Sequence, residues 1–140
     1  MNLPSPELLH IADLTADLGE PVSIEGTPNG TRRLIPILGG EISGLRLRGK
    51  VLPGGADFQA IRHDDVIDLH ARYVLELEDG TRVYVENSGF RHGPPENAYF
   101  RTTARFECPA GPHEWLMKHI VVGQGIRHLN RVEIRFFLVT

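Results

Sequence analysis

The sequence predicts an all-β fold, a single antiparallel β-barrel over residues 1–140 with at most one or two short helices. Three observations predict it. Apolar and polar residues alternate with a period of two through much of the chain. The 15 glycines and 10 prolines are spread out, and they interrupt short apolar runs about every dozen residues. The best helical candidate, 111–118, is long enough for only a turn or two.

The clearest element is a hairpin over 66–90. Its first strand, 66–79, alternates throughout, and Asp79-Gly80 supplies a turn because both residues tolerate positive φ. The segment 81–90 forms the return strand. The apolar face of the first strand would carry Ile67, Leu69, Ala71, Tyr73, Leu75 and Leu77.

The same alternation predicts the other strands, at 31–38, 42–52, 56–62, 98–108, 119–128 and 131–139. The opening segment 8–18 fits a strand or a helix, and its β-rich context favours a strand. Strands in this number form a barrel or a sandwich. Consecutive hairpins with short turns favour an up-and-down, calycin-like or lipocalin-like barrel of about eight to ten strands, because closure removes exposed sheet edges.

Composition restricts the partners. The net charge is -3, from 15 basic and 18 acidic residues, which argues against nucleic acid and anionic membranes. No apolar run approaches the roughly 18 residues of a membrane span. Cys108 is the only cysteine, so no internal disulfide forms. Because the first residues also lack the pattern of a secretory signal, we expect a cytoplasmic protein.

Motifs for metals, cofactors and nucleophiles are absent. The seven histidines have no metal-ligand spacing, so we expect no metal. Gly123 and Gly125 lack the third glycine of a dinucleotide site, so they indicate a bulge or bend, and no cofactor is expected. Cys108 and Ser88 have no activating partner in the sequence that would make either a nucleophile.

Several segments together resemble one family. They are "GTRRLIPILGGEISG", "GKVLPGGADFQ", "LHARYVLELEDGTRVYVENSGFR", "YFRTTARFE", "EWL" and "VVGQGIR". Their order is similar to that of the domain-of-unknown-function 3237 family, from about residue 26 to the C-terminus. The resemblance implies an all-β, calycin-like barrel and little about activity. One departure is His70, where the family usually has aspartate; if it faces the pocket, it would change the ligand or the proton chemistry.

The candidate site is a polar cluster on the middle strands, made up of Asp57, Gln59, Arg62, Asp68, Arg72, Asn87, Arg91, Tyr99 and Arg101. Asp57 and Gln59 are two residues apart, so they point to the same side of their strand, and we expect that side to line a pocket. Arg72 or Arg101 would supply the countercharge. Asp57 would act as a general base, and Tyr99 as an acid or oxyanion donor. The alternative is a solvated outer face on which these residues form weak ion pairs.

Two further residues are candidates for ligand binding. Asn87 shares a strand face with Val83 and Val85, so it is expected to point inward. Trp115 either plugs one end of the barrel or forms a stacking wall for a planar ligand. With Asp57 and Tyr99 as catalytic residues, the predicted ligand-binding residues are therefore Gln59, Arg72, Asn87, Arg101 and Trp115.

These features favour a barrel that binds a small organic ligand, with aromatic metabolites among the candidates. A cofactor-free isomerase, cyclase or lyase that uses acid–base chemistry would fit such a site. The alternative is a non-catalytic carrier or a structural homo-oligomer. In either case we expect a homodimer or a larger assembly, because polar residues inside the barrel would leave apolar residues outside.

Overall fold

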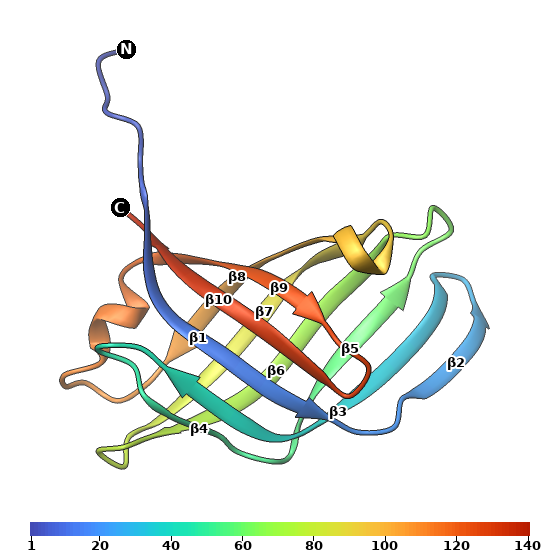
Figure 1. Ribbon diagram of the computed structural model, residues 1–140, viewed down its shortest axis with the longest axis horizontal. Helices are drawn as coiled ribbons and strands as arrows, with labels where there is room; N and C mark the ends of the chain where they lie inside the picture. The colour runs from blue at the N-terminus through green and yellow to red at the C-terminus, as the bar shows by residue number, and fades with distance from the viewer.

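A computed structural model describes all residues, 1–140, and it confirms the antiparallel barrel. The polypeptide forms ten strands and two short 3-10 turns (Figure 1). The strands are β1 (Leu8–Leu18), β2 (Val22–Thr27), β3 (Gly30–Ser43), β4 (Gly49–Val51), β5 (Gly55–Ile61), β6 (Ile67–Leu77), β7 (Arg82–His92), β8 (Tyr99–Glu107), β9 (Ile120–Arg127) and β10 (Arg131–Val139). The turns are η1 (Pro95–Asn97) and η2 (Glu114–Met117).

Strands β5 to β10 follow one another as neighbours around the barrel, and β1 closes it by pairing with both β10 and β3. The short β4 and the following β5 occupy one position between β3 and β6, one beyond the other. The predicted segment 8–18 is a strand over its full length, and the hairpin at 66–90 is present with its second strand extended to His92.

The prediction of separate strands at 31–38 and 42–52 was wrong. The structure has one long strand, β3, that continues through Gly39 and Gly40 with φ of 152° and 153°. A side chain at Gly40 would overlap the carbonyl oxygen of Thr15, so glycine lets β1 approach closely at the closure of the barrel. Residues 44–48 then leave the sheet, because the chain crosses the end of the barrel there and buries Leu47.

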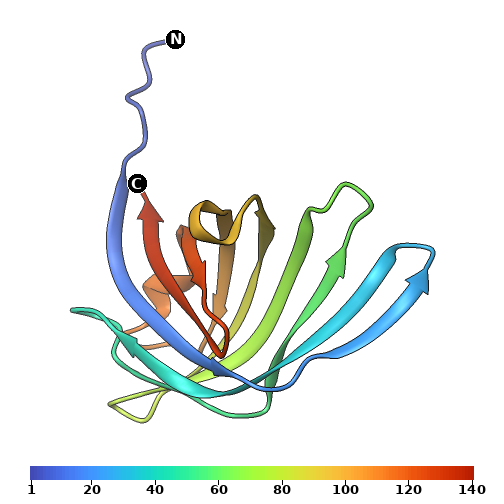
Figure 2. The same cartoon turned by 45° about the vertical axis from the view of Figure 1, so that its right-hand side comes forward.

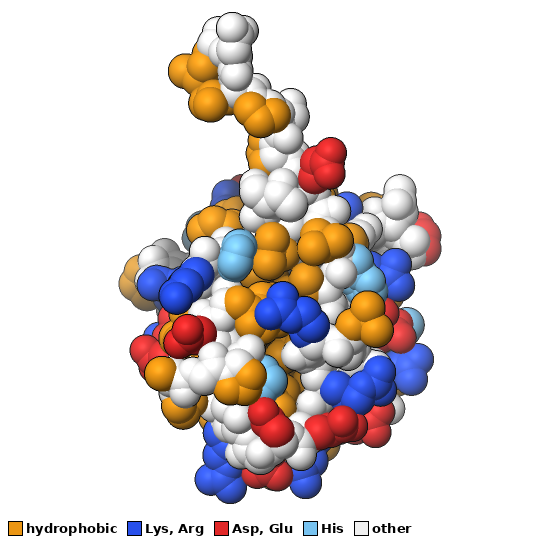
Figure 3. All heavy atoms as spheres, turned by 90° about the vertical axis from the view of Figure 1, so that its left-hand side faces the viewer, with side chains coloured by type: hydrophobic (Ala, Val, Ile, Leu, Met, Phe, Trp, Pro, Cys, Tyr) orange, Lys and Arg blue, Asp and Glu red, His pale blue; other side chains and the backbone are white.

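The interior is filled by inward-facing residues of every strand except β2. Phe136, Leu75, Val83, Val85 and Val121 are fully buried. The end of the barrel that holds the β3–β4 loop and η2, which we call the closed end, is plugged by Leu47 and Leu116. Figure 3 looks onto this end, where hydrophobic side chains gather in the middle.

The opposite end, which we call the open end, holds the β2–β3, β5–β6 and β9–β10 turns. Strand β2 was not predicted, because five of its six residues are exposed and it has no alternating pattern of burial. It pairs with β3 alone, and no strand occupies its other edge. Figure 2 shows β2 and the first half of β3 projecting from the barrel as a flap. The wall is therefore incomplete beside this end.

None of the helical segments has the length and apolar character that a membrane crossing requires.

Candidate active site

A small cavity lies inside the barrel, between the packed core and the open end. Its volume is about 60 Å³, and it is partly open to solvent. Most of its wall is apolar, with polar side chains concentrated on one part of the lining. The polar or charged lining residues are Asp57, Gln59, Tyr73, Arg91, Thr102 and Arg127.

Asp57 lies at a local gap in the β5–β6 ladder. The register is the same on both sides of the gap, but Phe58 and Gln59 do not pair with β6. The backbone N–H of His70, freed by this gap, donates to Oδ1 of Asp57 at 2.8 Å. The carboxylate thus replaces a backbone acceptor and is held in a fixed position in the wall of the cavity.

Gln59 connects Asp57 to an arginine. Its side-chain amide donates to Oδ2 of Asp57 at 2.8 Å. Its Oε1 accepts from Nε and Nη2 of Arg33 at 2.9 and 2.7 Å. Gln59 is 3% exposed, so this relay of hydrogen bonds is shielded from water. Asp57 and Gln59 therefore point to the same interior side.

The positive charges near Asp57 are Arg33, Arg91 and Arg127, not Arg72 or Arg101. All three are partly buried, and none belongs to an ion pair of the structure. Desolvation lowers the pKa of Arg91, and the charges of Arg127 and Arg33 lower it further, while Asp57 opposes the shift. Burial likewise lowers the pKa of Arg127, and Arg33 adds to the effect.

Burial also perturbs the proton affinity of Asp57. Loss of hydration raises its pKa above the ordinary value of 3.8. The hydrogen bonds from Gln59 and from the His70 backbone oppose this rise, as do the positive charges of Arg91 and Arg127. A buried carboxyl whose pKa is raised is a candidate to accept and return a proton.

This raised pKa predicts a pH dependence of stability. The folded state binds the Asp57 proton more tightly than the unfolded chain does, so the stabilisation is complete below 3.8 and is lost as pH rises through the folded pKa. Each tenfold difference in proton affinity is worth about 1.4 kcal/mol. In urea titrations, the free energy of unfolding of the wild type minus that of Asp57→Asn should fall over this window. A difference that rises with pH would contradict the assignment.

Five buried side-chain polar atoms have no hydrogen-bond partner. Two of them are Oγ1 of Thr102 and Oδ1 of Asn87, on side chains that are 6% and 5% exposed. Nε of Arg91 is also buried and unpaired. Buried polar groups are normally satisfied, so these atoms indicate places for a water or a ligand. Asn87 thus points inward, among the core residues Val85 and Ala104 of the same sheet face.

Gly123 and Gly125 form neither a bulge nor a phosphate loop. Strand β9 pairs with β10 in unbroken register through both. A Cβ at Gly125 would lie 2.6 Å from the ring of Phe100, and one at Gly123 would overlap Oγ1 of Thr102. The two glycines make room for interior side chains beside the cavity.

Three predicted site residues lie outside the barrel. Arg72 is within 3.9 Å of Glu86 on the outer face. Tyr99 is 48% exposed and stacks on His92, and the guanidinium of Arg101 lies 5.0 Å from the Tyr99 ring. The alternation that points Asp57 inward in β5 points these side chains outward in β6 and β8.

Trp115 lies at the closed end, away from Asp57. It packs against the core cluster, and the guanidinium of Arg46 lies 4.3 Å from its ring centroid. Of the two roles considered from the sequence, this position fits a plug at one end of the barrel and not a stacking wall for a ligand.

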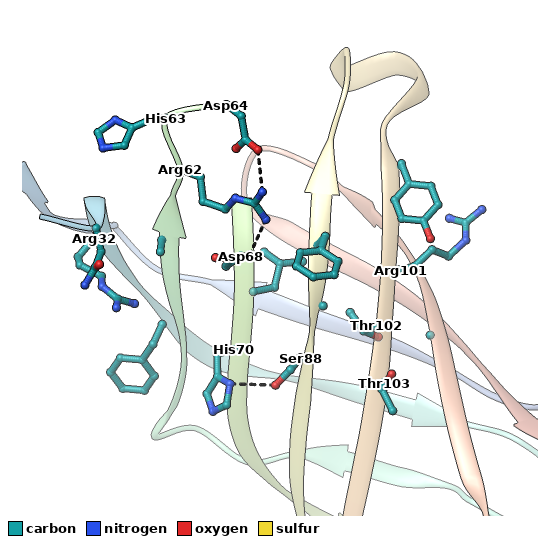
Figure 4. Close-up of a pocket in the computed structure, with 18 of the residues that line it drawn as sticks. Arg32, Arg62, His63, Asp64, Asp68, His70, Ser88, Arg101, Thr102 and Thr103 are labelled. Atoms are coloured by element: carbon teal, nitrogen blue, oxygen red, sulfur yellow. Dashed lines mark hydrogen bonds and ion pairs between the residues drawn. The ribbon is translucent and has the colours of Figure 1, made fainter. Parts of the chain in front are cut away.

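A wider hollow lies on the outer face of the sheet, with a volume of about 1450 Å³ open to solvent (Figure 4). Arg62 pairs there with Asp64 at 2.7 Å and with Asp68 at 3.7 Å. Nδ1 of His70 lies 2.9 Å from the hydroxyl oxygen of Ser88. These groups are mostly solvated, so their ion pairs are weak. The interior cavity is the stronger candidate because it holds desolvated charge.

A family model described as "Protein of unknown function (DUF3237)" matches residues 6–139. The chain belongs to this family. A UPF0311 protein of Rhodopseudomonas palustris is 43% identical over 145 residues, which cover 94% of this chain and 95% of the relative.

Solved structures of DUF3237 relatives have the same fold. A protein of unknown function from Clostridium acetobutylicum is 34% identical, with a TM-score of 0.95 over 99% of this chain and 100% of its own. A protein from Acinetobacter baumannii described as "beta-barrel like" is 30% identical, with a TM-score of 0.94 over 99% of each chain.

His70 contacts the cavity carboxylate through its backbone alone. The imidazole is on the outer face beside Ser88, and only the N–H of His70 reaches Asp57. A change of side chain at this position therefore leaves the contact with the cavity carboxylate in place.

The sequence did not point to Arg33 or Arg127, and it placed Arg91 in the polar cluster without assigning it to Asp57, although strand parity could have identified all three. Arg91 is four residues from Asn87, on the inward face of β7. Arg127 has the parity of the buried Val121, and Arg33 has that of Ile35 and Ile37. All three arginines lie near strand ends. The alternation of apolar and polar residues stops there, so it indicates least clearly which side chains point inward.

Proposed function

We propose that the barrel interior binds a small organic molecule and that Asp57 transfers a proton to or from it. The observation that carries the proposal is the Asp57 carboxyl, fixed by two hydrogen bonds in an apolar cavity that raises its pKa. Fixed geometry and a pKa shifted toward the working pH are the two requirements of a general base.

The reaction class that suits these residues is a proton shift without a cofactor. Asp57 would take a proton from a carbon or oxygen atom of the substrate. The electron pair of the broken bond would then move toward a neighbouring carbonyl oxygen, or it would form the new bond that closes a ring. Asp57 would then return the proton to another atom of the substrate or to a leaving group. Isomerisation, cyclisation and elimination all balance in this way.

Native mass spectrometry on protein purified gently from its source tests ligand binding. We expect a small molecule at one copy per chain that is released on denaturation. The same molecule should be retained by Asp68→Asn, a carboxylate change on the outer face. Protein that carries nothing, and takes up nothing from an extract of the same cells, would count against the proposal.

A second candidate, a structural homo-oligomer, is favoured by the outer hollow. Phe58, Phe90 and Tyr99 are each about half exposed there, at 47%, 49% and 48%. Exposed aromatic side chains that gather in one hollow are typical of interaction surfaces. Both signs of charge line the same hollow, which suits a second copy of the chain.

This candidate has its own test. Phe90→Glu should shift the protein to monomer in sedimentation experiments, whereas Glu41→Gln, an exposed change away from the hollow, should not. A wild type that is already monomeric at high concentration would exclude this candidate, without bearing on the interior site.

A further inference from the structure

The interior of the barrel has more positive charge than it can neutralise. Two guanidinium groups, of Arg91 and Arg127, act on a single carboxyl, that of Asp57, and a third, of Arg33, is linked to it through Gln59. None of the three arginines has a carboxylate oxygen within ion-pair distance, although many carboxylates elsewhere in the chain are paired. Partly buried charge without a partner is costly, so an anion is the missing component.

The arginines differ in how far their donors are used. Nε and Nη2 of Arg33 both donate to Gln59, so this side chain is engaged in holding the relay to Asp57. Arg91 and Arg127 donate to no side chain of the structure, and Nε of Arg91 is buried without a partner. The two free guanidinium groups are therefore the ones available to a ligand.

The position of the Arg91 and Arg127 guanidinium groups indicates which kind of anion would bind. Arg91 and Arg127 lie at the ends of β7 and β9 and line one cavity with Asp57. The rest of the lining includes Leu69, Phe100 and Ile134. A fully hydrated inorganic ion would leave these apolar walls uncovered, whereas an organic anion would cover them with its carbon skeleton.

We infer that the ligand is a small organic anion, a carboxylate or an enolate, whose oxygen accepts hydrogen bonds from Arg91 and Arg127 while its carbon skeleton lies against the apolar wall near Asp57. This inference rests on the proposed function for the site and names its substrate class. Guanidinium groups bind such oxygens with charge-assisted hydrogen bonds. In a proton shift they would also stabilise the oxyanion that forms when Asp57 removes a proton.

Matched pairs of probes test the inference. The anions are isobutyrate and benzoate, and the neutral controls are isobutyramide and benzamide, which have the same carbon skeletons. Each is titrated into the full-length protein and followed by NMR through the Nε–Hε signals of the arginines. We expect at least one acid to bind about tenfold or more tightly than its amide and to shift Arg91 and Arg127.

Variants identify the groups responsible. Arg91→Met and Arg127→Met should each lose most of that preference for the anion. Arg105→Met, on the exposed face of β8, is the matched control and should retain it. Equal binding of acid and amide, no binding of either acid, or unchanged binding in both Met variants would overturn the inference. Tighter binding of inorganic phosphate than of either acid would also overturn it.

Asp57→Asn separates this inference from the proposed catalytic role. It removes the one negative charge of the cavity, so benzoate or isobutyrate should bind at least as tightly as to the wild type. If the acids bind but Asp57 proves unnecessary for any turnover, the anion site stands and the proton-transfer role fails. If Asp57→Asn weakens anion binding tenfold, the charge argument is wrong.

Discussion

Asp57→Asn is expected to lower kcat by about 10²- to 10⁴-fold, the usual contribution of a general acid–base group. This corresponds to about 2.7 to 5.5 kcal/mol in the activation free energy. Asparagine has nearly the same shape and can still accept the hydrogen bond from the His70 N–H, but it cannot take a proton. The assay uses the molecule found by native mass spectrometry, or compounds of its class.

The control for this substitution is Asp68→Asn. Asp68 is a carboxylate on the neighbouring strand, but it lies in the solvated outer hollow beside Arg62. Its loss should change kcat by less than about twofold, because screened surface pairs contribute little. Thermal melts of both variants establish that they are folded. Turnover that survives in folded Asp57→Asn would refute the catalytic role.

Phe136→Ala is expected to lower the free energy of unfolding by about 3 to 5 kcal/mol. Phe136 is 0% exposed and meets Phe106 edge to face, with ring centroids 5.9 Å apart. It lies opposite Gly123 of β9, so the barrel wall beside it has no side chain that could fill the space. Because a domain of this kind has about 5 to 15 kcal/mol of total stability, the loss is a large fraction.

Phe137→Ala is the matched control. The adjacent side chain points to the opposite face of β10, where it is only partly buried and contacts His10 at a ring-centroid distance of 5.7 Å. We expect a cost of about 1 kcal/mol in urea unfolding. Similar costs at both positions would mean that the inward face of β10 is misassigned.

The sequence predicted the barrel well because alternation is a local property. The β6–β7 hairpin was recognisable from Asp79-Gly80 and the pattern on either side. Parity also placed Asp57 and Gln59 on one side of their strand and turned Asn87 inward, but it left open whether the Asp57 side faced a pocket or solvent. Strand β2 has no such pattern, since its position depends on pairing with β3 alone.

The partners of Asp57 could not be predicted in the same way. Arg72 and Arg101 were plausible from the sequence because they lie on the middle strands, but both are on the opposite face. Which arginines meet a carboxylate depends on the registers of β3, β7 and β9 relative to β5, and these registers are set by the closure of the barrel. The relay from Arg33 through Gln59 joins residues 26 positions apart and has no local signal.

The central claim is that Asp57 is a proton-transfer group in a desolvated cavity, and a ¹³C NMR titration of its side-chain carboxyl tests it most directly. The signal is assigned by its absence from Asp57→Asn. We predict a titration midpoint above the ordinary aspartate value of 3.8. A midpoint at or below 3.8 would mean that the nearby arginines and hydrogen bonds outweigh desolvation, and Asp57 would then be a structural countercharge instead of a base.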